Sequence, residues 1–128
     1  MITLKMSRDR AIRLSRACEI LARLGMQQFG ELLDLFGVID YDKGIEIDHY
    51  LKEKIGELRP SEYNGIKSTQ VCEEAKIAWD AYQHLRREIS WSDKGLDWRK
   101  DKRDWHDMNG VCYDEPMKAS SLPGDFET

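Results

Sequence analysis

The clearest hydrophobic pattern in the chain runs from Thr69 to Trp91. Apolar residues recur at alternating steps of four and three, at Val71, Ala75, Ala78, Tyr82, Leu85 and Ile89. This spacing places them on one face of an α-helix. The opposite face is expected to be solvated and carries Glu73, Lys76, Asp80, Gln83 and Arg87. Ser68 precedes the pattern and is the expected N-cap, because its hydroxyl can accept a bond from a first-turn N–H.

A second helix is predicted from Ser7, its N-cap, to Leu24, with Gly25 as its end. Its expected inward seam consists of Leu14, Ala17, Cys18, Leu21 and Leu24. Its expected outward face carries Arg13, Arg16 and Arg23, together with Ile12 and Ile20.

The middle of the chain predicts two shorter helices. One spans Met26–Phe36 and is closed by Gly37; the other spans residues 49–58, with Asp48 as N-cap and Arg59-Pro60 as its stop. Ile45–Ile47 fits either a brief strand or the entry to that helix.

Further strand signals occur at the two ends of the chain. Ile2, Leu4 and Met6 alternate with polar residues, which predicts a short strand, and Val111–Tyr113 follows a tight-turn dipeptide and could pair with it. We therefore expect an α+β fold that is mostly α, with three to four helices and a small antiparallel sheet or hairpin. We expect a single helical domain over residues 1–115, followed by a surface-running or disordered tail over residues 116–128.

The distribution of charge along the chain is more informative than its net value. Charged residues make up 34% of the 128 residues and the net charge is −4, so the whole chain is not a general attractor of nucleic acid. Residues 1–24 and 86–103 are basic, and residues 25–66 are acidic. No apolar run approaches a membrane span and no signal peptide is recognised. Three widely separated cysteines suit reduced thiols in a cytoplasmic protein better than disulfides.

Catalytic signatures are absent from the sequence. The histidines and cysteines show no metal-ligand spacing, and neither a nucleophile elbow nor a glycine-rich phosphate loop occurs. We therefore expect a protein that is not an enzyme and that uses neither a cofactor nor a metal.

The most suggestive region for binding is basic and aromatic. The candidate ligand-binding residues are Arg86, Arg87, Trp91, Trp98, Arg99, Arg103 and Trp105. Guanidinium groups bind phosphates in a bidentate manner and indoles stack on bases, so together they would suit a small anionic nucleotide. The alternative is that the tryptophans pack inward and the bases pair with Asp93, Asp97, Asp101 and Asp104. Arg13, Arg16 and Arg23 form a secondary basic face, which is either solvated or a second contact for an anion or a protein.

Three segments resemble a family of small uncharacterised phage and prophage accessory proteins. They are RLGMQQFGEL within Leu21–Leu32, AYQHLRREISW at Ala81–Trp91 and YDEPMKAS at Tyr113–Ser120. Together they cover about a quarter of the chain. The chain departs from the family pattern at residues 92–107, where a charged insert replaces a shorter loop.

The resemblance implies a non-enzymatic binding protein acting in the host cytoplasm, by analogy of class rather than of site. The first hypothesis is a counter-defence factor, a homo-oligomer that sequesters a small anionic nucleotide signal. A direct inhibitor of a host protein is the alternative, with the tryptophans as interface anchors. A DNA-binding accessory protein acting through the Arg13–Arg16–Arg23 face is the third.

Overall fold

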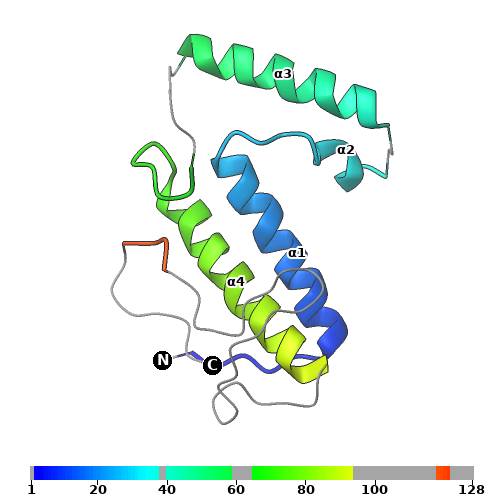
Figure 1. The fold of residues 1–128 in the computed structure, drawn as a ribbon, viewed down its shortest axis with the longest axis vertical. Helices are drawn as coiled ribbons and strands as arrows, with labels where there is room; N and C mark the ends of the chain where they lie inside the picture. Colours follow the sequence, from blue (N-terminus) through cyan, green and yellow to red (C-terminus); the bar gives the residue numbers. More distant parts are fainter. Residues whose placement is uncertain (1, 38–39, 59–64, 94–117, 122–128) are drawn as a thin grey trace.

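The computed structural model describes residues 2–37, 40–58, 65–93 and 118–121, and its regular elements are helices (Figure 1). They are α1 (Arg8–Gly25), α2 (Leu32–Leu35), α3 (Tyr41–Leu58) and α4 (Glu73–Asp93). The described ranges contain no strand. The predicted α+β class with an antiparallel sheet is therefore wrong, and the fold is helical.

The expected strand at Ile2–Met6 shows why the class prediction failed. These residues are extended and exposed, with no neighbouring strand in the described part of the chain. Alternation of apolar and polar residues shows only that a segment is compatible with a strand. A strand becomes stable by pairing with another strand, which the alternation does not indicate. Its proposed partner, Val111–Tyr113, lies outside the described residues.

The centre of the fold is an antiparallel pair of helices, α1 and α4, which lie side by side (Figure 1). Small side chains fill the contact: Ser15 and Ala22 of α1 are buried, as are Ala75 and Ala78 of α4. Where α1 begins and α4 ends, Arg8 donates two hydrogen bonds to the Asp93 carboxylate, at 2.6 and 2.8 Å. The small residues let the two backbones approach closely.

Helix α1 was located correctly but its buried face was not. Ser7 caps it as predicted, because its Oγ accepts a bond from the Arg10 N–H at 3.3 Å. However, Leu14 and Leu21 of the expected inward seam are 40% and 47% exposed. The face that meets α4 is rotated by about a quarter turn from the leucines, toward Ser15 and Ala22.

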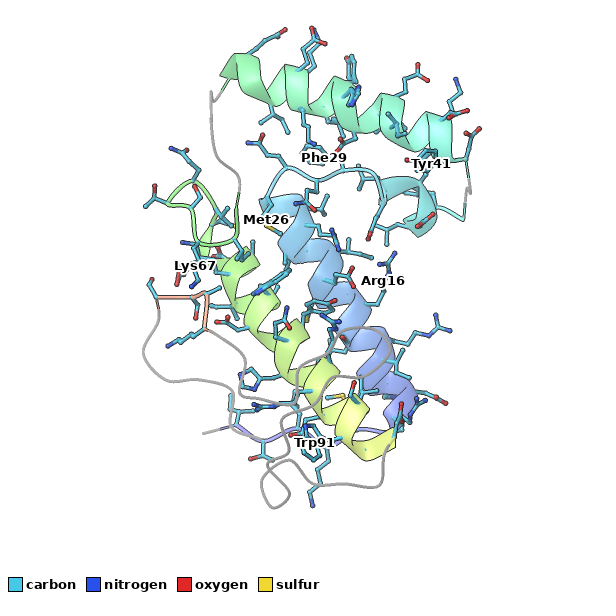
Figure 2. All side chains as sticks on the ribbon, in the orientation of Figure 1. Arg16, Met26, Phe29, Tyr41, Lys67 and Trp91 are labelled. Atoms are coloured by element: carbon cyan, nitrogen blue, oxygen red, sulfur yellow. The ribbon has the colours of Figure 1, made fainter. Side chains whose placement is uncertain are left out.

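The largest buried apolar cluster lies where α1 ends and α4 begins. Met26, Val71 and Ala75 form it, and Ile66 and Trp79 pack against it from the side. The predicted apolar face is therefore confirmed at Ala75 and Ala78 of α4, which are buried, and Val71, just before the helix, is buried with them. Figure 2 shows Met26 at this junction.

Helix α4 begins later than its pattern indicated. Ser68 is not its N-cap; its Oγ accepts a bond from the Gln70 N–H at 3.1 Å, within the turn that precedes the helix. The helix then runs to Asp93, so Arg86 and Arg87 lie inside it rather than in its last turn.

The middle of the chain differs most from the sequence prediction. Only Leu32–Leu35 of the expected 26–36 helix is helical, whereas α3 starts at Tyr41 and includes Asp48 in its interior. Asp48 is thus not an N-cap. Its carboxylate instead accepts the Phe29 N–H at 2.7 Å and so ties α3 to the segment after α1. Helix α3 lies across the ends of α1 and α4 rather than alongside them (Figure 1).

Candidate functional site

The predicted basic and aromatic site is only partly described by the structure. Trp98, Arg99, Arg103 and Trp105 lie outside the described residues. Arg86, Arg87 and Trp91 belong to α4, and Arg87 and Trp91 are each only 1% exposed. In this conformation a ligand arriving from solvent would reach neither of the two.

Arg86 has a different environment from Arg87. Its guanidinium lies over the Tyr82 ring, 5.0 Å from the centroid, and Tyr82 in turn packs against Trp79. Burial is the main reason why the pKa of the Tyr82 hydroxyl is raised above its usual range. Arg86 therefore contributes to a packed aromatic group on the surface of α4.

Helix α4 has a buried polar stripe that the sequence analysis assigned in part to the wet face. Asp80, His84, Arg87 and Trp91 follow one another at steps of four, three and four, and all are buried. The Arg87 Nη2 and His84 Nδ1 atoms are 3.3 Å apart. The polar stripe has the same alternating four- and three-residue spacing as an apolar helix face. A search of the sequence for a second stripe with this period could therefore have found it.

Residues 118–121 lie against this polar stripe. The Asp80 carboxylate accepts the Ala119 N–H at 2.7 Å and the Ser120 N–H at 3.1 Å. Glu73, two turns earlier on α4, accepts bonds from the N–H and the hydroxyl of Ser121. Two carboxylates of α4 thus hold a segment that is far away in sequence.

The secondary basic face is largely neutralised by acids. Arg16 lies 3.1 Å from Glu31 and 3.7 Å from Asp34, and Arg23 lies 3.0 Å from Glu19. Arg13 forms no ion pair with the described part of the chain. The three arginines therefore do not act together as a free cationic surface.

An open cavity of about 390 Å³ separates α3 from the segment that follows α1. Its lining consists of Arg23, Gln28, Gly30, Glu31, Ile45, Asp48, His49 and Lys52. The Lys52 and Arg23 charges on its wall are already paired, since Lys52 lies 2.9 Å from Asp48 and Arg23 lies 3.0 Å from Glu19. The cavity is mixed in polarity and offers no concentrated positive charge.

Large apolar side chains are exposed where α2 meets the first turns of α3. We call this group the α2–α3 corner; it consists of Leu35, Phe36, Tyr41 and Ile45. Phe36 is 77% exposed and Tyr41 82%, and Figure 2 shows Tyr41 at the start of α3 beside α2. Exposed aromatic residues close together in sequence are typical of surfaces that bind another protein.

The remaining reactive groups do not form a site. Burial raises the pKa of the Cys18 thiol, while Cys72 is exposed. Cys112 lies outside the described residues. In the described ranges, no group of three or more His, Cys, Asp or Glu side chains could hold a metal ion. No helix among those residues is long and apolar enough to cross a membrane.

The chain matches no protein-family model, no curated protein and no solved structure. Its function must therefore be argued from its own residues.

Proposed function

We propose that this protein is a binding module that docks on another protein through the α2–α3 corner. The observation that carries the proposal is the exposure of two aromatic side chains, Phe36 and Tyr41, which lie between the exposed Leu35 and Ile45 in the sequence. Burying an apolar side chain of this size contributes about 1.5–3 kcal/mol. Aromatic residues are also enriched among those that dominate binding energy.

Small-ligand sequestration is less well supported by the same structure. Arg87 and Trp91 are buried, Arg86 lies over Tyr82, and the cavity wall has its charges paired. A site for an anionic nucleotide needs cations that are free to contact phosphate. Direct binding to a protein, the alternative raised by the sequence, thus becomes the first candidate. A phage origin and a host target remain expectations from the resemblance.

The test is site-specific photo-crosslinking from Phe36 in cells or lysate of the natural host, compared with crosslinking from Lys67. Lys67 is exposed on the turn before α4, away from the corner (Figure 2). We expect one dominant crosslinked protein from position 36 and none of the same mass from position 67. A Phe36→Ser, Tyr41→Ser variant should lose binding of that purified partner at least about tenfold, the effect of about 1.4 kcal/mol.

The matched control replaces exposed apolar residues elsewhere, Ile2→Ser with Leu4→Ser, and should leave binding unchanged. Equal loss in the control, or unchanged binding in the corner variant, would contradict the proposal. Native mass spectrometry of the freshly purified protein supplies the competing outcome. A nucleotide that copurifies and is released intact by heat would favour sequestration instead.

A further inference from the structure

Helix α1 has a solvent-facing side that combines apolar and basic residues. We call it the α1 outer face; it consists of Arg10, Arg13, Leu14, Ala17 and Leu21. The steps from Arg10 to Leu14, Ala17 and Leu21 are four, three and four, so these residues form one stripe along the helix. All five are exposed, on a side of the helix that does not meet α4.

The two arginines of this face are available for contact. Neither Arg10 nor Arg13 forms an ion pair with the described residues, in contrast to Arg8, which binds Asp93, and Arg16, which binds Glu31. A stripe of two leucines flanked by cations that pair with no described residue is complementary to an acidic surface that also carries an apolar group.

Helix α3 presents such a surface. We call it the α3 outer face; it consists of Asp42, Glu46, Tyr50 and Glu53. These residues are exposed, and Tyr50 is 56% exposed. Asp42 and Glu53 form no ion pair with the described part of the chain, and Glu46 is held only by Lys43, at 3.3 Å.

We infer that the α1 outer face of one copy binds the α3 outer face of another copy. The two faces belong to α1 and α3, and α3 lies across the end of α1 rather than alongside it (Figure 1). The residues of both faces are exposed, so one chain does not satisfy both contacts itself. Their opposite charges argue for this partner, because arginines would meet carboxylates. Leu14 and Leu21 would pack against the part of the Tyr50 ring that Lys54, whose Nζ lies 5.8 Å from the ring centroid, leaves exposed.

The contact is head-to-tail, so its geometry differs from that of a symmetric dimer. Each copy uses two different surfaces, and assembly continues to a ring or a short filament according to the rotation between copies. Each helix is 18 residues, or roughly 27 Å at 1.5 Å per residue, which limits the contact to the smaller class of specific interfaces. We therefore expect weak association that falls as salt concentration rises.

The test is a charge-exchange experiment followed by sedimentation velocity at low salt. One variant carries Arg10→Glu and Arg13→Glu, so that both of its outer faces are acidic. The other carries Glu46→Lys and Glu53→Lys, so that both of its faces are basic. Each variant alone should be monomeric, with association weakened about tenfold or more. An equimolar mixture should assemble again, because every α1 face then meets an oppositely charged α3 face.

Circular dichroism establishes that both variants keep the helical fold, and Glu at position 10 suits the first turn of a helix. The matched control compares Arg13→Glu with Lys67→Glu, which changes the net charge equally but lies on the turn before α4. Only Arg13→Glu should weaken assembly. The inference is overturned if the wild type stays monomeric at low salt and high concentration, or if the mixture fails to assemble. It is also overturned if both variants associate as the wild type does, which would assign association to the α2–α3 corner.

Discussion

At the scale of single residues, Gly25 decides how closely α1 and α4 approach. It is the last residue of α1, and a Cβ atom added there would overlap the Cβ of Ala75. A glycine at a helix end often adopts a positive φ. The positive φ occurs at Gln27 instead, at 60°, so the glycine is required for space rather than for backbone freedom.

Gly25→Ala should destabilise the protein by about 1–3 kcal/mol, because the added methyl group overpacks the helix contact. Urea unfolding followed by circular dichroism measures this. Gly56→Ala is the matched control: it lies inside α3 with open space around its Cβ position, and should stabilise by about 0.5–1 kcal/mol. Adding Ala75→Gly to Gly25→Ala should restore part of the loss, and no restoration would contradict this account.

Asp80 is the second residue whose role is visible only from its contacts in the fold. Its carboxylate is 2% exposed and accepts the N–H groups of Ala119 and Ser120. Asp80→Ala should cost about 1–3 kcal/mol, since two donors lose their acceptor. Trypsin should also cleave faster after Lys118. Glu74→Ala, on an exposed position of the same helix, should change neither stability nor cleavage; equal effects in both variants would refute an anchoring role for Asp80.

At the scale of elements, α3 is fastened through Asp48. Burial opposes ionisation of this carboxyl, but the Phe29 N–H bond and Lys52 outweigh it, so the pKa of Asp48 is lowered. A lowered pKa in the folded state means that the charged form stabilises folding. This contribution is complete above the ordinary aspartate pKa of about 3.9 and is lost as pH falls through the lower folded value.

Asp48→Asn should therefore reduce the free energy of unfolding at pH 7, and the difference from wild type should shrink below about pH 4. The measurement is chemical unfolding across pH 2.5–7, conditions chosen to span the aspartate range. Asp42→Asn, which removes an exposed carboxylate of the same helix with no ion pair to the described residues, should have little effect. A difference that stays constant down to the lowest pH would show that the charge of Asp48 does not stabilise α3.

The elements show which parts of the fold the sequence could predict. The end signals of α1 and the apolar stripe of α4 are local, and both helices were located within a few residues. The buried face of α1 was harder to predict, because a close contact between helices favours small residues such as Ser15 and Ala22 over the neighbouring leucines. Asp48 suits an N-cap by residue type, and only its bond to Phe29, nineteen residues away, reveals its role. Arg87 likewise suits a solvated helix face by residue type, although it is buried in the structure.

At the scale of the whole molecule, stability is expected to be unevenly distributed. Helices α1 and α4 pack along their length, with buried residues at both ends, whereas α3 packs against neither of them comparably. Its described attachments are the Asp48 bond to Phe29 and the close approach of Gly44 to the Gly30 carbonyl. Most of the stability of a helix in a protein comes from tertiary packing, so α3 depends on these attachments.

Hydrogen exchange should therefore separate the molecule into two parts. Amides of α3 should exchange through a local opening of lower free energy, while amides in the middle of α1 and α4 should exchange only near global unfolding. Asp48→Ala should accelerate exchange in α3 more than in the α1–α4 pair, since it removes an attachment of α3 alone. Gly25→Ala should have the opposite pattern: it weakens the contact between α1 and α4 and should accelerate amide exchange in all three helices. Equal protection of α3 and α4 in the wild type would mean that α3 unfolds with the pair as one cooperative unit, and would remove the reason for treating α3 as separately mobile.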